Sequence, residues 1–299
     1  MTLIIGAGLS GLMAANLFPS AQVIEAGSED QLNHKAVLRF RNRSVADAMG
    51  VEFKSVKVNK GIWHDGAFVQ PNIQLANWYA KKVIGKVVPR SIWNLETVER
   101  FIAPEDIMAI LAERCYKRIQ WNQQAGGARV CGRAKGTLST MPMPALAKLI
   151  GADTNETEFK HEAISVRRWR LPDAAVHQTI YFPSPATNLY RVSITGDLII
   201  AEYSGQPDAY DFFPAFGLQE NDCITIDTTR QGYGKIASID DKFRKRFIFD
   251  ATTKHNIYSV GRFAIWKNIL ADDVLQDLFV IKKLMNSDTY DRSCHNTKK

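Results

Sequence analysis

The sequence predicts an α/β protein with two interleaved domains, one around a parallel sheet and a smaller one that contains an antiparallel sheet. Three observations predict this class. Residues 2–17 have the pattern of a buried strand that leads through a glycine-rich turn into a helix. Residues 159–235 alternate apolar and polar side chains between turns rich in Pro, Asn and Gly, as antiparallel strands do. The chain has 299 residues, and because about 100–200 residues make one domain, two domains fit.

The opening segment carries the strongest motif of the chain. The run Gly6-Ala-Gly8-Leu-Ser-Gly11 follows a short apolar strand and begins a helix, and a second strand over residues 21–25 ends in Glu25. In this pattern the first glycine makes a tight turn, the second lets the backbone approach a pyrophosphate, and the third lets the helix pack on the strand. An acid at the end of the second strand binds a free ribose hydroxyl. The segment therefore predicts a Rossmann-like dinucleotide site that favours FAD or NAD over NADP.

Further elements follow from periodicity and turn residues. Apolar residues at helical spacing predict one helix over residues 72–84, ended by Gly85, and another over residues 104–114 with Pro104 in its first turn. A closing helix is expected from Asp272, as its N-cap, to about residue 285, with a frayed tail from residue 286. Short strands are expected at residues 119–121, 130–132, 177–182, 190–194 and 197–203.

The composition is that of a folded protein with a basic balance. Hydrophobic residues make up 45% of the chain and charged residues 23%, which excludes disordered, collagen-like and coiled-coil chains. The 38 Lys and Arg residues outnumber the 31 Asp and Glu residues, which gives a net charge of +7. This balance favours an anionic partner, and a nucleotide cofactor, a nucleic acid and a sugar nucleotide all qualify.

Targeting and metal-binding signals are missing from the sequence. The apolar runs are too short for a transmembrane helix, and no basic leader precedes the first strand, so we expect a cytoplasmic protein with no membrane partner. The four cysteines form no CxxC pair, and the histidines lack metal-ligand spacing. We therefore expect reduced thiols and no metal site. Hydrolase, kinase and metalloprotease motifs are also lacking.

Three segments together resemble flavoproteins of the amine oxidase and UDP-galactopyranose mutase superfamily. They are the opening glycine motif with Glu25, residues 136–144 (Gly-Thr-Leu-Ser-Thr-Met-Pro-Met-Pro), and residues 258–266 (Tyr-Ser-Val-Gly-Arg-Phe-Ala-Ile-Trp) followed by Asp272-Asp273. The resemblance implies a glutathione reductase-type fold with bound FAD. It implies an FAD-binding domain of residues 1–60, 100–150 and 250–299 and a substrate domain of residues 61–99 and 151–249. The implied cofactor-binding residues are Gly6, Gly8, Leu9, Ser10, Gly11, Glu25, Ala26, Thr140, Gly261, Arg262, Asp272 and Asp273.

The chain also departs from this superfamily near the flavin. The Gly-Gly-Arg loop of amine oxidases is absent from residues 27–39, and the histidine loop of the mutases is missing, which leaves His34 and His64 as early histidines. Catalytic residues are therefore not carried over from the superfamily. The candidates for catalysis or substrate contact are His34, Lys35, Tyr181, Tyr190 and Arg191, the last three because the mutases grip an anionic substrate with tyrosine and arginine in this sheet.

Two arginine clusters have two interpretations each. Residues 38–43 alternate cations with other residues, so a strand there would place Arg39, Arg41 and Arg43 on one face, either as a phosphate clamp or as a solvated edge strand. The run Arg167-Arg168-Trp169-Arg170 is typical of a nucleic-acid groove or of surface arginines around a buried tryptophan. Trp266 either lines the flavin pocket or belongs to the core.

The functional hypothesis is an FAD-dependent isomerase or oxidoreductase. Residues 258–273 are most similar to bacteriophage flavoproteins of thymidine hypermodification, some of which isomerise a glycyl group on thymidine. That resemblance implies a modified thymidine base in DNA as substrate, phosphate contacts from the two arginine clusters, and the host cytoplasm as location. Alternatives are a nucleotide-linked sugar, as in the mutases, a small amine, or an inert dinucleotide- or nucleic-acid-binding module. The oligomeric state stays open.

Overall fold

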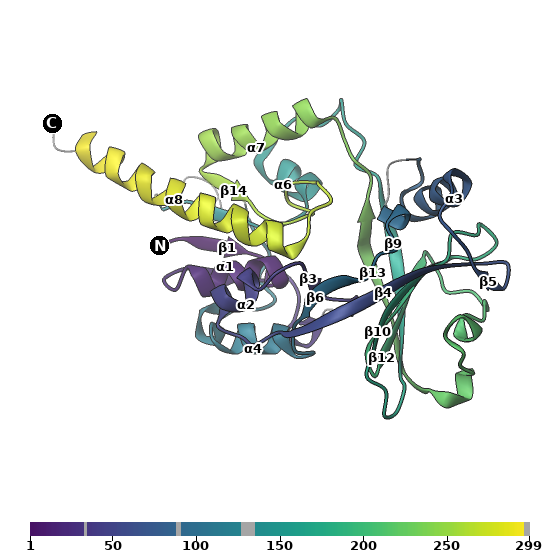
Figure 1. Cartoon of the computed structure of the whole chain (residues 1–299). Coiled ribbons are helices and arrows are strands. Elements are labelled where there is room, and N and C mark those ends of the chain that lie inside the picture. Colours follow the sequence, from purple (N-terminus) through teal and green to yellow (C-terminus); the bar gives the residue numbers. More distant parts are fainter. Residues whose placement is uncertain (33–34, 88–90, 127–134, 296–299) are drawn as a thin grey trace.

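The structure is a computed structural model that describes residues 1–32, 35–87, 91–126 and 135–295. Two sheets organise the described chain (Figure 1). The small sheet has five parallel strands in the order β14-β8-β1-β2-β7, and the large sheet has nine strands. The mixed α/β class predicted from the sequence is confirmed. The strands of the small sheet are β1 (Leu3–Ile5), β2 (Gln22–Ile24), β7 (Ile119–Gln120), β8 (Thr137–Ser139) and β14 (Ile257–Ser259).

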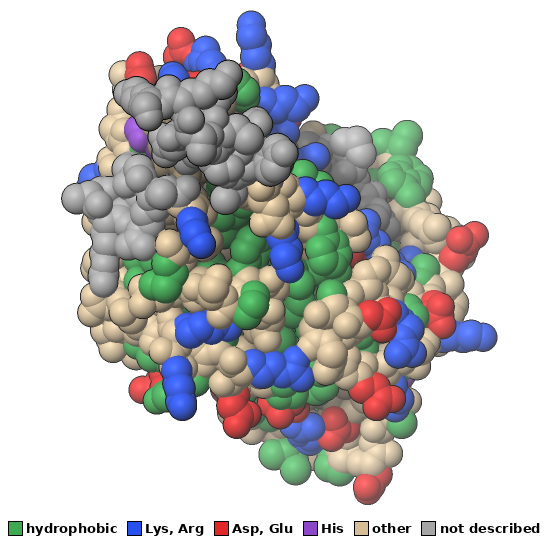
Figure 2. All heavy atoms as spheres, turned by 90° about the vertical axis from the view of Figure 1, so that its left-hand side faces the viewer, with side chains coloured by type: hydrophobic (Ala, Val, Ile, Leu, Met, Phe, Trp, Pro, Cys, Tyr) green, Lys and Arg blue, Asp and Glu red, His purple; other side chains and the backbone are tan. Residues whose placement is uncertain are grey.

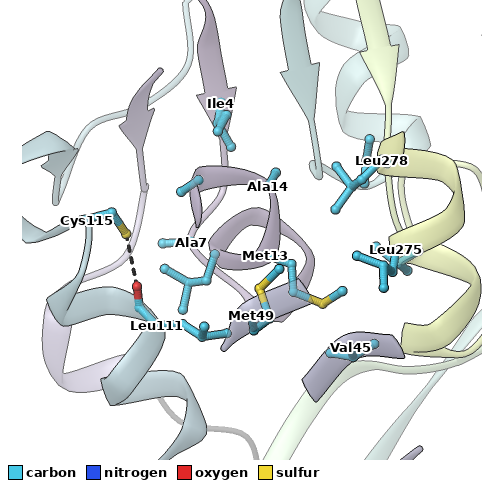
Figure 3. Close-up of a cluster of buried hydrophobic side chains, with 14 of the residues drawn as sticks. Ile4, Ala7, Met13, Ala14, Val45, Met49, Leu111, Cys115, Leu275 and Leu278 are labelled. Atoms are coloured by element: carbon cyan, nitrogen blue, oxygen red, sulfur yellow. Dashed lines mark hydrogen bonds between the residues drawn. The ribbon is translucent and has the colours of Figure 1, made fainter. Parts of the chain in front are cut away.

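Helices cover both faces of the small sheet. One face packs against α1, α2, α4 and α8 through a buried cluster that includes Ile4, Met13, Met49, Leu111 and Leu275 (Figure 3). The opposite face packs against α6 and α7. These helices are α1 (Leu9–Leu17), α2 (Ser44–Met49), α4 (Ile107–Glu113), α6 (Met143–Ile150), α7 (Asp241–His255) and α8 (Ala271–His295).

The large sheet is mostly antiparallel and stands beside the small one (Figure 1). Its order is β13-β9-β12-β11-β10-β4-β6-β3, with β5 paired to β4, and the β4–β10 pair is parallel. The strands are β3 (Arg39–Phe40), β4 (Lys54–His64), β5 (Ala67–Phe68), β6 (Val98–Ile102), β9 (His161–Arg170), β10 (Val176–Tyr181), β11 (Leu189–Gly196), β12 (Leu198–Ser204) and β13 (Ile224–Ile236).

Each face of the large sheet is covered differently. One face packs against the short helix η4 (Phe213–Phe216) around Trp169. The other packs against α3 (Ile73–Ile84). The remaining short helices are η1 (Glu29–Gln31), η2 (Ser91–Trp93), η3 (Tyr116–Arg118) and η5 (Glu220–Asp222).

The chain passes repeatedly between the two sheets, as an interleaved fold requires. It leaves the small sheet after β2, returns after β6, leaves again after α6 and returns with α7. The predicted boundary at residue 60 falls inside β4. Within the described residues, no helix combines the length and apolar character needed to cross a membrane.

Helix α3 confirms its prediction closely. The Asn72 side chain accepts a hydrogen bond from the backbone N–H of Leu75 at 2.9 Å, so it caps the first turn. Gly85 ends the helix with φ +74°, a conformation that glycine adopts without strain. The predicted helix over residues 104–114 is shorter and begins at Ile107. The strand expected at residues 130–132 lies outside the described residues.

Two local predictions are wrong, and one helix was not predicted. Residues 38–43 do not form one strand, because β3 contains only Arg39 and Phe40 and pairs with β6. The tail does not fray from residue 286, since α8 continues to His295. Helix α7 was not predicted, and its buried residues Phe243, Phe247 and Ala251 recur every four positions.

Candidate functional site

The glycine motif folds as its spacing predicts. Gly6 has φ +97°, and a Cβ there would lie 2.2 Å from Thr140 Oγ1. A Cβ on Gly11 would lie 1.9 Å from the carbonyl oxygen of Gly6, so only glycine lets α1 approach β1. The Thr140 side chain is fixed by a hydrogen bond that its hydroxyl donates to the Ile5 carbonyl at 2.8 Å. The two outer glycines therefore serve the packing of strand, helix and the segment after β8.

Gly8 differs from the other two glycines because the space in front of it is open. Apart from its two neighbours in the sequence, no residue of the described chain has a heavy atom within 4 Å of a Cβ built on Gly8, whose φ is an ordinary −65°. Helix α1 starts there with no side-chain cap and no acidic residue in its first turn, as far as the described residues go. Uncapped N–H groups and the positive end of the helix dipole form an anion site. This is the position where a dinucleotide pyrophosphate binds in such motifs.

The Glu25 carboxylate lies against the same loop. One of its oxygens accepts a hydrogen bond from the Ala7 N–H at 2.6 Å, and the other accepts from the Gly27 N–H at 2.8 Å. Ala26 lies between these contacts and is exposed. Glu25 therefore joins the end of β2 to the glycine loop, and it is placed to accept a ribose hydroxyl beside that loop.

The predicted C-terminal cofactor segment meets the glycine motif. Gly261 has φ +92°, and a Cβ there would lie 2.6 Å from Ser10 Oγ in the first turn of α1. Arg262 donates to the Ile269 carbonyl at 3.3 and 3.2 Å, which closes the loop before α8. Trp266 is 1% exposed, packs in the core with α7, and donates to the Ala237 carbonyl at 3.0 Å. Of the two interpretations of Trp266, the structure supports the core.

The start of α8 corrects a prediction. Asp272 is not the N-cap, because the helix begins at Ala271. The Asp272 carboxylate accepts from the backbone N–H of Arg41 at 3.0 Å, and the Arg41 guanidinium contacts both Asp272 and Asp273. Asp273 also accepts from the Leu270 N–H at 2.9 Å. The two acids therefore dock the segment after β3 onto the first turn of α8.

The three arginines predicted on one strand face have separate partners. Arg41 pairs with the acids of α8, and Arg43 pairs with Asp47 on the surface. The physical reason is that the chain leaves β3 after Phe40, so the period of two is not maintained. A shared phosphate clamp of Arg39, Arg41 and Arg43 on one strand is therefore wrong as geometry.

Arg39 instead reaches from the edge strand β3 to the middle strands β10 and β11 of the same large sheet. Its guanidinium donates to Thr179 Oγ1 at 2.6 Å, and to the Ile194 carbonyl and Thr195 Oγ1, both at 2.7 Å. Burial, together with the nearby positive charge of Arg191, lowers the pKa of Arg39 to about 10. Its Nε is buried without a hydrogen-bond partner among the described residues. Arg39 thus brings a cation from the β2–β3 segment to the centre of the large sheet.

The second arginine cluster is also divided. Arg167 stacks its guanidinium over Trp169 at 5.0 Å on one face of β9. On the other face Arg168 donates twice to Asp227, at 2.8 and 2.6 Å, and Arg170 pairs with Asp197 at 2.9 Å. The three arginines therefore do not converge on one face of β9, because neighbours on a strand alternate faces. Trp169 is buried, as the alternative interpretation expects.

The predicted substrate residues of the large sheet do converge. Tyr181 of β10 and Arg191 of β11 are cross-strand partners, and Tyr190 lies at the register shift between Leu189 and Arg191. Tyr79 of α3 packs edge-on against both tyrosines, at 5.4 and 6.4 Å between ring centroids. We call this surface, with Thr179, Tyr181, Arg191, Ser193, Thr195 and Glu202, the polar face.

Sequence reasoning missed Glu202 and Tyr79. Glu202 is 1% exposed, and its carboxylate receives hydrogen bonds from Arg191 Nε and from the Tyr190 hydroxyl, the latter at 3.2 Å. The sequence does indicate that Glu202 is buried, because the alternation of β12 places it on the same face as the apolar Leu198 and Ile200. A carboxylate in such a position needs a buried partner.

A cavity of about 210 Å³ lies between the segments that follow β2 and β6 and the end of the large sheet where β11 meets β12. Its walls include Lys35 and Leu38 from the segment after β2, Ala103 from the segment after β6, and Thr195 and Ile200 from the large sheet. Lys35 pairs with Asp227 at 3.5 Å. His34 lies outside the described residues. A second cavity, of about 500 Å³, lies on the outer side of α3 around Ile73 and Trp78 and has no predicted site residue in its walls.

No cluster of three or more His, Cys, Asp or Glu side chains suited to a metal ion occurs in the part of the chain that is described. The described residues instead offer an anion site at the start of α1 and, on the large sheet, a polar face that carries cations and hydroxyl groups.

The comparisons with known proteins bear on the fold. No family model matches the sequence, and no curated protein matches it. Among solved structures, a reduced UDP-galactopyranose mutase matches with a TM-score of 0.69 and 14% identity, over 95% of this chain and 93% of that chain. An oxidoreductase from Methanosarcina mazei matches with a TM-score of 0.59 and 11% identity, over 94% and 99%. A protein described as an FAD-containing monooxygenase from Photorhabdus luminescens subsp. laumondii has a TM-score of 0.52 and 10% identity, over 96% and 89%.

These likenesses show the fold. The chain has the two-sheet α/β architecture of UDP-galactopyranose mutase and related oxidoreductases over almost its whole length. The fold class predicted from the sequence is confirmed, and so is the resemblance to the mutase at the level of fold.

Proposed function

We propose that the protein is an FAD-dependent enzyme. The observation that carries this proposal is Gly8, whose open side faces the uncapped start of α1 within the loop braced by Glu25. The fold is shared with a protein described as FAD-containing. Two buried hydroxyls without a partner in the described chain, Ser139 Oγ and Ser259 Oγ, lie on adjacent strands at the carboxyl edge of the same sheet. Dinucleotides bind at this edge in parallel sheets.

The residues present fit this cofactor. The N–H groups of Leu9 and Ser10 would hold the pyrophosphate, Glu25 the adenosine ribose, and the Gly261 loop the opposite side of the phosphates. When bound, the flavin supplies electron-transfer and covalent chemistry that side chains lack. The protein supplies orientation and charge.

The substrate side of the proposal rests on the polar face. Arg191, which is 28% exposed, and Tyr181 are cross-strand partners on this face, and Arg39 reaches the same face from β3. Guanidinium forks bind phosphates in a bidentate manner, and a tyrosine ring with a hydroxyl suits a sugar or a base. We therefore favour a small phosphate-bearing, nucleotide-linked substrate, as in the mutase of the same fold.

A modified thymidine base in DNA is the second candidate. The observation that favours it is the net charge of +7. Figure 2 shows Lys and Arg side chains over the middle of one face of the molecule, with Asp and Glu mostly towards its edges. Because Arg168 and Arg170 are paired with acids, phosphate contacts in this case fall to other surface cations. A base in a duplex has to leave the stack to reach the cavity.

The test begins with cofactor content. Purified protein is denatured, and the released compound is identified by chromatography and absorbance, with noncovalent FAD expected in near-equimolar amount. Release of NAD or of no dinucleotide would overturn the proposal. Holoprotein is then offered UDP-galactopyranose and modified phage-type DNA in parallel. Sugar products support the first substrate class, altered nucleosides support the second, and flavin that neither turns over nor changes its spectrum identifies an inert module.

A further inference from the structure

The pair Arg191 and Glu202 is the most unusual feature of the polar face. The two residues stand directly opposite each other on the antiparallel strands β11 and β12. The register shifts between Leu189 and Arg191, so Tyr190 is the extra residue of a bulge. The bulge brings Tyr190 and Arg191 to the same carboxylate, which accepts from both. Bulges re-aim side chains in this way beside functional sites.

The two partners are buried to different degrees. Glu202 is 1% exposed, whereas the Arg191 side chain is 28% exposed. Burial alone would raise the pKa of Glu202, but the charges of Arg191 and Lys235 and the two hydrogen bonds outweigh it, so the pKa lies below its ordinary value and the group is ionised. A buried ion pair is weak evidence for stability, since an apolar pair of similar volume is often as good. The pair therefore calls for a functional explanation.

Arg191 is held by one end only. Its Nε donates to Glu202, and within the described residues its two terminal nitrogens have no hydrogen-bond partner and are not buried orphans. Arg39 lies close enough to Arg191 for the two positive charges to interact. The terminal nitrogens of Arg39 already donate to Thr179, Ile194 and Thr195. Two neighbouring cations repel each other, so Arg191 would turn away unless it were anchored. Glu202 supplies that anchor.

We propose that Glu202 is a positioning residue that fixes Arg191 with its terminal nitrogens directed towards the anionic group of the substrate. The inference rests on the proposed function, because it assumes a phosphate-bearing substrate at the polar face. Glu202 itself touches no substrate. It acts by holding Nε, which leaves a planar two-nitrogen fork for a phosphate, and the Tyr190 hydroxyl fixes the other oxygen of the carboxylate.

The direction in which Glu202→Gln changes the affinity for anions distinguishes a positioning role from a purely electrostatic effect. Glu202→Gln removes a negative charge beside an anion site, and by Coulomb's law alone it would tighten anion binding. If Glu202 positions Arg191, the same substitution weakens binding. The measurement is titration calorimetry of flavin-loaded protein with UDP and with inorganic pyrophosphate. We expect about a tenfold loss of affinity for each probe in Glu202→Gln, and a similar or larger loss in Arg191→Gln.

A double-substitution cycle completes the test. Positioning requires that Glu202→Gln cause no further loss in the Arg191→Gln background, whereas a general structural defect adds its own loss. The double variant keeps hydrogen-bonding amides at both positions, so it remains informative if Glu202→Gln alone folds poorly. Asp208→Asn is the matched control, because Asp208 accepts from Thr187 and Asn188 at the end of the same sheet, outside the site. It should leave both affinities unchanged.

The possible failures are distinguishable. Unchanged or tighter anion binding in Glu202→Gln, additive losses in the cycle, or wild-type holoprotein that binds neither probe would overturn the positioning role while FAD remains bound. Loss of the proposed function itself appears earlier, as protein that carries no flavin.

Discussion

The Glu25 carboxylate accepts a 2.6 Å hydrogen bond from the backbone N–H of Ala7, across the 18 positions that separate the two residues. The contact lies inside the glycine motif, so the acid at the end of β2 has a structural role as well as the role expected towards a ribose. Glu25 shapes the loop that surrounds Gly8 before any ligand arrives. This dual role makes its substitution more informative than that of a residue that only contacts a ligand.

Glu25→Ala should weaken FAD binding without unfolding the protein. The variant loses a charge-assisted acceptor for the ribose and two loop contacts, which together are worth about 1–3 kcal/mol, or roughly 5- to 150-fold in Kd. The measurement is titration of apoprotein with FAD by flavin fluorescence. Glu25→Gln keeps one acceptor oxygen, so its Kd for FAD should fall between those of the wild type and Glu25→Ala. An unchanged Kd in Glu25→Ala would contradict the assignment of the ribose site.

Gly8→Val should abolish flavin binding while the fold is kept. The added side chain enters open space at an ordinary φ, so it strains nothing in the described chain, but it fills the position needed by a pyrophosphate. Flavin absorbance per protein and thermal unfolding of the apoprotein measure the two effects separately. Gly11→Ala is the contrasting variant, since its Cβ would meet the Gly6 carbonyl at 1.9 Å and should lower the unfolding temperature. Full flavin occupancy in Gly8→Val would mean that the pyrophosphate binds elsewhere.

Lys82 should make stability rise with pH above neutrality. Its amine donates to the Phe182 and Leu189 carbonyls at 2.7 and 2.9 Å, and burial lowers its pKa from 10.5 to about 7. Between these values the unfolded chain holds a proton that the folded chain has released, so the free energy of unfolding increases with pH through this window. Urea unfolding of wild type and Lys82→Met at pH 7, 8, 9 and 10 isolates this contribution. The wild-type curve should rise relative to the variant, and parallel curves would refute the prediction.

The ion pairs of the two arginine clusters should contribute different amounts to the free energy of unfolding. Arg168→Met leaves the partly buried Asp227 without its bidentate partner, at a cost of about 1–3 kcal/mol. Arg43→Met breaks a pair whose side chains are 61% and 65% exposed, and should change stability by less than about 1 kcal/mol. Denaturant unfolding measures both. Equal losses of stability in Arg168→Met and Arg43→Met would contradict the prediction that the Arg168–Asp227 pair contributes more.

The same Arg168→Met variant also tests the DNA prediction. An arginine that neutralises a phosphate adds about one unit to the slope of log affinity against log salt. Because Arg168 is paired with Asp227, its replacement should leave the slope for duplex DNA unchanged. A shallower slope in Arg168→Met would mean that the pair opens to bind phosphate.

The glycine motif, its acid and helix α3 were predictable because their signals are local. Gly6, Gly11 and Glu25 interact within one strand–helix–strand unit, and Asn72 and Gly85 terminate a helix through their own backbone and side chains. Such contacts are encoded by spacing alone. Helix α7 also had a local signal, Asp240 as cap followed by apolar residues every four positions, which its many cations obscured.

The arginine partners were not predictable because they depend on tertiary contacts. Arg41 meets Asp272 across 231 positions, and Arg39 meets Thr195 across 156. The alternation of residues 38–43 matches a strand period, but nothing local states where the strand stops. Glu202 is partly predictable. The alternation of its strand indicates a buried charge, but its partner Arg191 can be identified only once the order of the strands in the sheet is known.

The strand order of the small sheet has a consequence for synthesis of the protein. Strand β8 lies between β1 and β14, so one of its edges has no neighbour until Ile257–Ser259 has been made. At ~5–20 residues per second, the roughly 120 residues between β8 and β14 take about 6–24 seconds to translate. During that time the nascent chain carries an apolar strand with an open edge, which invites pairing with other chains. Premature termination or proteolysis before β14 should therefore yield aggregating fragments rather than a smaller folded domain.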